Sequence, residues 1–258
     1  MLETYLRERL KEKEILLMTH IVLGYPSFEE AFKVIEAMVE GGVDLVELQI
    51  PFSEPIADGP VILRANQEAL GRGIKVDACL EFAGKVARTF DIPFLVMSYY
   101  NILFKRGVAS FVAAMAQNGL RGAIVADLPL EEGEEYVRAM ETQGLSPIFL
   151  FSPTTSLERM QAIASSAKGF VYCVARKGVT GAETRFSEDL TAYLDRCRQA
   201  TSLPLALGFG VRGESDVDFL KGKADIAVVG SQVIRVLDEQ GIPGVRSFIR
   251  RLSAVCSP

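Results

Sequence analysis

The sequence of 258 residues is poor in metal-binding and redox-active side chains. It contains one histidine, His20, and four cysteines that no CxxC spacing joins. One imidazole cannot build the histidine-rich site of a zinc or iron enzyme, and acidic residues alone do not define a magnesium site, so we expect no metal. A chain of this length needs no disulfides to hold its core, so we expect free thiols and a cytoplasmic location.

Signals for membranes and nucleic acids are also missing. No apolar run approaches the roughly 18 residues of a membrane-spanning helix, and residues 1–14, MLETYLRERLKEKE, predict a charged amphipathic helix rather than a signal peptide. The formal charge is -5 with both signs interspersed, so no nucleic-acid or membrane partner is expected. The sequence GFGVRG, residues 208–213, has glycines at the spacing of a dinucleotide-binding motif. Because it comes at the seventh predicted strand and not after the first, it is only weak evidence for a dinucleotide-binding site.

What the sequence does contain is a regular alternation of apolar runs and helical segments. Eight runs are predicted as strands: 15–24, 43–50, 93–100, 122–130, 146–151, 169–175, 203–210 and 224–230. Helices are predicted at 27–42, where Ser27 and Glu30 have capping-box spacing, and at 107–119, 131–143, 156–166 and 185–199. Almost continuously apolar strands are typical of a parallel sheet covered by helices. The pattern predicts an α/β fold, a single-domain (β/α)8 TIM barrel over residues 1–258 with an extra N-terminal helix, rather than an open doubly wound sheet.

The stretch ELQIPFSEPIADGP, residues 47–60, brings carboxylates to the end of the second predicted strand. Alternation along that strand places Glu47 and Gln49 on the same face as Leu45. A carboxylate on an inner face costs on the order of several kcal/mol unless it is paired or protonated. Because the C-terminal ends of barrel strands form the active face, Glu47 is predicted to exchange protons with a substrate. The alternative is a structural carboxylate that backbone amides satisfy.

Further polar side chains are predicted at the same end of the barrel. Asp58, in a loop rich in proline and glycine, is expected to stay ionised as a fixed counter-charge beside Glu47. An N-cap or Asx turn is the alternative for Asp58. Tyr172, inside the sixth strand, either fills the barrel or lines a pocket. Tyr99 and Asn101 end the third strand, where they either act in the site or satisfy loop backbone.

Three glycine-rich turns follow the sixth, seventh and eighth strands, at residues 176–181, 208–213 and 229–234. Glycines let backbone amides approach an anion, and Ser231 is expected at a helix N-terminus, which favours phosphate. Barrel enzymes often bind a substrate phosphate with the loops after strands seven and eight. Together the turns predict a small phosphate ester as substrate, although any one of them could be a plain connector.

These motifs resemble the α subunit family of tryptophan synthase. The family signature reads Glu-Leu-Gly, an aliphatic residue, Pro-Phe-Ser-Asp-Pro, an aliphatic residue and Ala-Asp-Gly-Pro, which is similar to residues 47–60. The likeness covers nearly the whole chain, through GYP (24–26), SYYN (98–101), VADLPLEE (125–132), RKGVTGAETRF (176–186), LGFGVR (207–212) and VVGSQVI (228–234).

The resemblance implies a retro-aldol cleavage of indole-3-glycerol phosphate to indole and glyceraldehyde 3-phosphate. It assigns Glu47 as the acid/base that protonates the indole ring carbon and takes the proton of the side-chain hydroxyl. Asp58 would hydrogen-bond the indole nitrogen, and Tyr172 would lie beside the glutamate. The remaining family positions are Gly181, Gly210, Gly230 and Ser231 at the phosphate, and Thr180 in the loop that closes over the site and contacts Asp58.

A partner is implied in the same way. The family works with a β subunit that uses pyridoxal phosphate to join indole to serine, in an αββα complex, while the α subunit needs no cofactor. The segments around Glu54 and Asn101 resemble those that face this partner. A stand-alone lyase that releases free indole, a catalytically weak α-like regulator of the β subunit and another phosphate-binding barrel with a changed substrate are the alternatives.

Three positions depart from the family pattern. Gln49 stands where the family has glycine, and we expect it either to fill substrate space or to hydrogen-bond the catalytic acid. Glu54 replaces an aspartate tied to signalling between subunits. His20 replaces an apolar residue of the indole site and is expected to reshape or charge the pocket. Tyr99 is a further residue expected to modify this pocket, if its side chain acts in the site.

Overall fold

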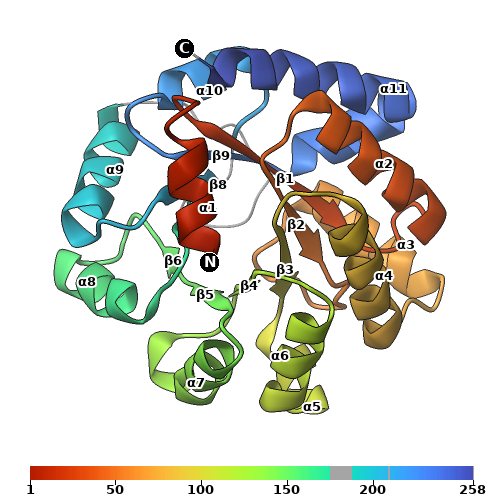
Figure 1. Cartoon of the computed structure of the whole chain (residues 1–258), viewed down its shortest axis with the longest axis horizontal. Coiled ribbons are helices and arrows are strands. Elements are labelled where there is room, and N and C mark those ends of the chain that lie inside the picture. Colours follow the sequence, from red (N-terminus) through yellow and green to blue (C-terminus); the bar gives the residue numbers. More distant parts are fainter. Residues whose placement is uncertain (175–187, 209, 258) are drawn as a thin grey trace.

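The computed structural model describes residues 1–174, 188–208 and 210–257. It shows a ring of parallel strands surrounded by helices, which confirms the predicted barrel (Figure 1). The strands follow the order β5-β4-β3-β2-β1-β9-β8-β7-β6 around the ring. Their bounds are β1 Leu16–Val22, β2 Leu45–Gln49, β3 Phe94–Ser98, β4 Gly122–Val125, β5 Ser146–Ile148, β6 Leu150–Phe151, β7 Val171–Val174, β8 Leu205–Gly208 and β9 Ile226–Val229.

The ring closes at the fifth predicted strand. Residues 146–151, expected as one strand, form the two short strands β5 and β6, with Phe149 between them. β5 pairs with β4 and β6 pairs with β7, so this one segment joins both ends of the sheet. The ladder continues through the break, because the carbonyl oxygen of Phe149 accepts a hydrogen bond from the Tyr172 N–H at 2.9 Å.

Helices cover the outer face of the barrel (Figure 1). Ser27 caps the second of them as predicted, since its hydroxyl oxygen accepts from the Glu30 N–H at 3.1 Å, and Gly42 ends it with φ at 96°. Gly241, with φ at 65°, bends the last one. The helices are α1 Leu2–Arg9, α2 Phe28–Gly41, α3 Pro60–Gly71, α4 Val76–Thr89, α5 Tyr100–Arg106, α6 Val108–Gln117, η1 Leu130–Glu132 (a 3-10 turn), α7 Glu134–Thr142, α8 Leu157–Ser166, α9 Glu188–Ala200, α10 Glu214–Leu220 and α11 Ser231–Cys256.

Buried apolar side chains form a cluster inside the barrel, and α1 contributes to it at the N-terminal end. Leu45 lies in a buried cluster inside the ring, while its strand neighbours Val46 and Leu48 pack in the layer between strands and helices. Leu2 and Leu6 of α1 join the inner cluster, and α1 lies across this end of the barrel (Figure 1). The predicted substrate site is expected at the other end of the strands, where Glu47 and Gln49 lie.

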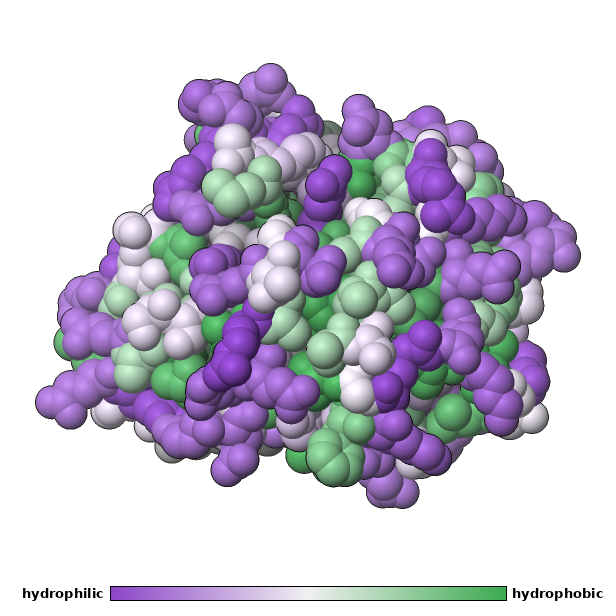
Figure 2. Space-filling model, turned by 60° about the horizontal axis from the view of Figure 1, so that its bottom comes forward, coloured by the Kyte–Doolittle hydropathy of each residue, from purple (hydrophilic) through white to green (hydrophobic). Residues whose placement is uncertain are grey.

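The outer surface mixes polar and apolar groups. The face shown in Figure 2 carries hydrophilic side chains with hydrophobic groups between them. Among the residues that the structure describes, the strongly exposed large hydrophobic side chains are Met1, Ile56 and Phe104, the last two at 70% and 69%. None of the helices that the structure describes is long and apolar enough to cross a membrane.

A buried carboxylate fixes the N-terminal segment to the barrel, and replacing it should destabilise the fold. Asp44, 1% exposed, accepts hydrogen bonds from Lys13 at 2.9 Å, Arg9 at 3.1 Å and the Leu17 N–H at 2.9 Å. Asp44→Asn keeps an acceptor for Leu17 but removes the charge opposite Lys13, which is only 10% exposed. We expect urea unfolding to show a loss of about 2–3 kcal/mol.

The control for this prediction is an exposed ion pair on the same segment. Glu8→Gln breaks the pair with Lys11, in which both side chains are more than 60% exposed. The cost of that substitution should stay below about 0.5 kcal/mol. Equal losses in the two variants would show that Asp44 contributes no more than a surface charge.

Candidate active site

Glu47 lies on β2 with its side chain inside the barrel. The residue is 3% exposed, and its neighbours in the parallel ladder are His20 on β1 and Leu95 on β3. This is the inner face that strand alternation predicts. No backbone N–H of the described residues satisfies the carboxylate, and its Oε2 atom is buried without a hydrogen-bond partner there. The geometry therefore favours a reactive acid over a structural one.

His20 is the nearest charged partner of Glu47. Its Nδ1 atom lies 3.2 Å from Glu47 Oε1, and the two side chains are 6% and 4% exposed. Burial disfavours the imidazolium, but the carboxylates of Glu47 and Asp58 outweigh this effect and raise the pKa of His20 above its usual value. The raised pKa favours the charged form of His20, which is the direction of one of the two effects expected for this departure from the family pattern.

Asp58 reaches the same pocket from the loop between β2 and α3. Gln49 Nε2 donates to its Oδ2 atom at 2.6 Å, and the Tyr99 hydroxyl donates to the same atom at 3.1 Å. Tyr99 is itself held, because it accepts a hydrogen bond from the Ala57 N–H at 3.2 Å. Burial raises the pKa of Asp58, although His20, Gln49 and Tyr99 oppose the shift. The N-cap of α3 is Gly59, so the Asp58 carboxylate does not cap that helix.

Gln49 was expected either to fill substrate space or to bond the catalytic acid, and the structure shows a different contact. The side chain bonds Asp58, the second acid, and not Glu47. Its Oε1 atom is buried without a partner among the described residues, as are Glu47 Oε2 and His20 Nε2. Three such atoms on two adjacent strands are unusual, because buried polar groups are nearly always hydrogen-bonded. They indicate a place where a polar ligand or water binds.

Tyr172 completes the wall on the opposite side. It lies on β7 next to Ala206 of β8, and its ring covers Gly208 so closely that a Cβ there would lie 2.2 Å from the hydroxyl oxygen. Only glycine fits at that position. Burial raises the pKa of Tyr172 well above its usual value, and the charges of Glu47 and Asp58 raise it further. The phenol is therefore neutral at physiological pH and lies within the field of both acids.

The predicted phosphate positions that the structure describes follow β8 and β9. Ser231 begins α11, as expected, and Gly230 precedes it at the end of β9. A Cβ at Gly230 would lie 3.6 Å from His20 Cβ, so this helix N-terminus adjoins β1 and the pocket. Gly210 has φ at 117°, a conformation that favours glycine. Thr180 and Gly181 lie outside the described residues.

The two residues expected to face a partner lie on the surface at this end. Glu54 is exposed in the loop after β2, and Asn101 is exposed at the start of α5, which follows β3. Ile56 and Phe104, two of the strongly exposed hydrophobic residues, belong to the same two segments. The loop after β2 thus carries a candidate acid, Asp58, on its inner side and exposed groups on its outer side.

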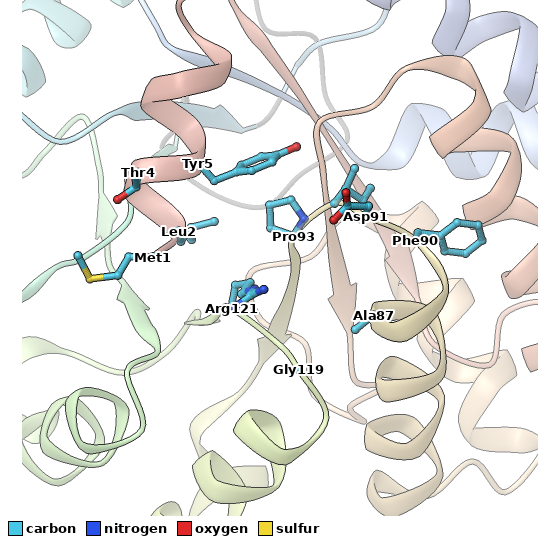
Figure 3. A pocket seen from close by; sticks show the side chains of 11 residues that line it. Met1, Leu2, Thr4, Tyr5, Ala87, Phe90, Asp91, Pro93, Gly119 and Arg121 are labelled. Atoms are coloured by element: carbon cyan, nitrogen blue, oxygen red, sulfur yellow. The ribbon is translucent and has the colours of Figure 1, made fainter.

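A separate cavity of about 320 Å³ lies at the N-terminal end of the barrel (Figure 3). Residues of α1 and the segments before β3 and β4 line it, among them Tyr5, Asp91, Pro93 and Arg121. Figure 3 shows the lining side chains on α1 and on the segments that lead into β3 and β4. Conserved features at this face of TIM barrels serve stability rather than catalysis, and the cavity contains neither Glu47 nor Asp58.

Comparison with known proteins agrees with this arrangement. Residues 6–257 match the family described as tryptophan synthase alpha chain. The chain is 66% identical to the tryptophan synthase alpha chain of Desulforapulum autotrophicum, covering 98% of this chain and 100% of that protein. It is 63% identical to the protein of the same name from Syntrophotalea carbinolica, with 98% and 100% covered. A structure of Mycobacterium tuberculosis tryptophan synthase superposes with a TM-score of 0.93 at 30% identity, covering 100% of this chain and 98% of that one.

Proposed function

The chain belongs to the tryptophan synthase alpha chain family and cleaves indole-3-glycerol phosphate to indole and glyceraldehyde 3-phosphate, and we propose that Glu47 and Asp58 perform this reaction. The observation that carries the proposal is that the buried Glu47 and the half-buried Asp58 lie at one end of the barrel with different partners, His20 for Glu47 and Gln49 with Tyr99 for Asp58. Indole release by the wild-type protein, and its loss when either acid is replaced, tests the assignment.

In the first step Glu47, as a carboxylic acid, protonates the ring carbon that bears the glycerol side chain. The positive charge that develops on the indole is stabilised by Asp58, which accepts the indole N–H. Gln49 and Tyr99 both bond Oδ2 of Asp58, and no described residue bonds Oδ1. We infer that Oδ1 is the atom that meets the indole nitrogen.

In the second step the Glu47 carboxylate takes the proton of the side-chain hydroxyl next to the ring. The oxygen forms a carbonyl group, the carbon–carbon bond breaks, and its electron pair restores the aromatic indole. One carboxyl group thus gives up a proton and takes up another in each turnover. The neutral Tyr172 beside the acids limits the space in which the substrate can turn.

The substrate phosphate is proposed to bind over the ends of β8 and β9. Ser231 and Gly230 offer backbone N–H groups at the N-terminus of α11, and Gly210 lets the preceding turn approach closely. Gly181 is proposed to contact the phosphate as well, and Thr180 is proposed to belong to the loop that closes over the site and contacts Asp58. Both residues lie outside the described residues. Fixing the phosphate places the reacting carbon over the acids, which lowers the entropic part of the barrier.

We also infer that the chain works with a β subunit in an αββα complex, and that pyridoxal phosphate belongs to that partner alone. Glu54 and Asn101, with the exposed Ile56 and Phe104 beside them, form the proposed contact surface. Large exposed hydrophobic side chains next to an active site are typical of a surface that another protein covers.

This contact surface gives a prediction. Phe104→Asp should weaken binding of the β subunit at least about 10-fold, because a buried aromatic anchor would become a charge. Titration of a labelled β subunit measures the effect. Lys11→Asp, which adds an acid at the opposite end of the barrel, is the control and should bind normally. Equal affinity for the wild type and the Phe104 variant would place the interface elsewhere.

A second prediction concerns Gln49. Gln49→Gly removes a donor that favours ionised Asp58, so the already raised pKa of Asp58 should rise further. Protonated Asp58 stabilises the cationic ring less well, so activity should be lost at a higher pH than in the wild type as the pH falls. The acid limb of kcat/KM against pH measures this shift, with Gln49→Met as a variant of similar volume that also lacks the donor. Identical acid limbs would show that Gln49 does not influence Asp58.

Two broader assignments complete the proposal. We infer that the whole chain forms one domain, since all described strands belong to a single sheet. We also infer that it works in the cytoplasm, since its four cysteines are buried and not joined by disulfides, as is common in a reducing compartment.

A further inference from the structure

His20 and Glu47 form a pair that is built into the barrel wall. The two residues are direct partners in the ladder between β1 and β2, so their side chains leave neighbouring backbone positions toward the same interior. Nδ1 of His20 lies 3.2 Å from Oε1 of Glu47, and water reaches neither side chain to a significant extent. At this distance the two side chains form an ion pair when His20 is protonated, and a movement of a few tenths of an ångström brings them within the range of a charge-assisted hydrogen bond.

The surroundings of the pair favour a positive imidazole. From β2 and the loop after it, His20 faces Glu47, Asp58 and the uncharged Gln49, and Gly230 at the end of β9 lies beside it. Tyr172 on β7 is neutral at physiological pH. Both charges near His20 are therefore negative. Gln49 also favours the charged imidazole, and together these groups overcome the effect of burial.

We propose that His20 and Glu47 act as one acid/base pair, in which His20 stores the proton that Glu47 delivers to the indole ring carbon. This inference rests on the proposed role of Glu47. In this proposal His20 acts through the carboxyl group of Glu47, so it is a positioning residue that also holds charge.

The proton balance over one turnover closes. The resting pair is an imidazolium and a carboxylate. Transfer of the Nδ1 proton gives a neutral imidazole and a carboxylic acid, which then protonates the ring carbon. The carboxylate formed in this way takes the hydroxyl proton as the carbon–carbon bond breaks, and that proton returns to Nδ1. No other donor or acceptor is needed, and the reaction consumes no net proton.

The single histidine allows a test that does not depend on activity. Untagged protein with ¹³C-labelled histidine gives one imidazole signal, which NMR follows between pH 5 and pH 10. The wild-type midpoint should lie above the usual value of about 6.5, and Glu47→Gln should lower it by at least about one pH unit. A wild-type midpoint at or below 6.5, or an equal midpoint in both proteins, would overturn the proposal. If the His20 midpoint is raised but the protein does not cleave indole-3-glycerol phosphate, the proposed function is contradicted. The interaction between His20 and Glu47 would still be supported.

The pH dependence of kcat provides the catalytic test. His20→Asn keeps a hydrogen-bond donor for Glu47 but cannot hold a proton, and His20→Phe keeps neither property. Both variants should lose kcat most strongly on the alkaline side, about 10-fold at pH 8.5 and less than 3-fold at pH 6. If His20→Asn unfolds at nearly the same urea concentration as the wild type, its loss of kcat comes from the missing proton and not from disturbed packing. A loss of equal size at every pH, or an unchanged alkaline limb, would show that His20 only fills space.

Discussion

Glu47→Gln is expected to lower kcat for cleavage of indole-3-glycerol phosphate about 1,000-fold and to change KM less than about 3-fold. General acid/base groups contribute about 100-fold to 10,000-fold, and Glu47 is proposed to serve in both proton transfers. Glutamine keeps the shape of the side chain and an oxygen that can accept from His20, but it cannot give up or take a proton in the reaction. Steady-state assay of indole measures both constants.

The control for this substitution is an exposed glutamate. Glu29→Gln removes a side chain on α2 that is 80% exposed and paired only with Lys33, so its kcat should equal that of the wild type. Circular dichroism and analogue binding show whether each variant is folded and recognises substrate. A kcat for Glu47→Gln within about 5-fold of the wild type would exclude Glu47 as the acid/base.

Asp58→Asn is expected to lower kcat about 100-fold. Asparagine has the same size and can still accept from Gln49 and Tyr99 through its amide oxygen, so the loop should keep its position. What is lost is the negative charge opposite the cationic ring, and a missing electrostatic contact of this kind typically costs about 100-fold to 1,000-fold. Because the phosphate contacts remain, KM should change little. Rapid-mixing measurement of a single turnover separates this chemical effect from product release.

The matching control is Asp91→Asn in the cavity at the N-terminal end of the barrel. Asp91 is an exposed aspartate far along the strands from the pocket, so its loss should leave kcat unchanged. If Asp58→Asn retains a kcat within about 3-fold of the wild type, the charge of Asp58 does not stabilise the intermediate. In that case the proposed contact between Asp58 Oδ1 and the indole nitrogen is contradicted.

The barrel and the inner position of Glu47 follow from the sequence because they depend on local periodicity. Alternation in LVELQ decides which side chains point inward, whatever the neighbouring strands are. The break at Phe149 was not predicted, because the apolar run through 146–151 reads as continuous. The short helices α5 and α10 and the longer α4 were also missing from the predicted helices.

The contacts within the pocket depend on register and on loop paths, which a single sequence does not reveal. His20 and Glu47 are 27 positions apart, and only the pairing of β1 with β2 brings them opposite each other. Gln49 bonds Asp58 because the loop after β2 turns back over the strand end. The closeness of Tyr172 to Gly208 likewise comes from the packing of β7 against β8. Such contacts could only be found in the folded chain.

The most direct test is indole release from indole-3-glycerol phosphate by the purified protein, first alone and then with a tryptophan synthase β subunit. We predict slow release by the protein alone, faster release with the partner, and loss of both in Glu47→Gln. No release under either condition, while the protein still alters the serine chemistry of the β subunit, would contradict the account and would show that Glu47 and Asp58 belong to a regulator.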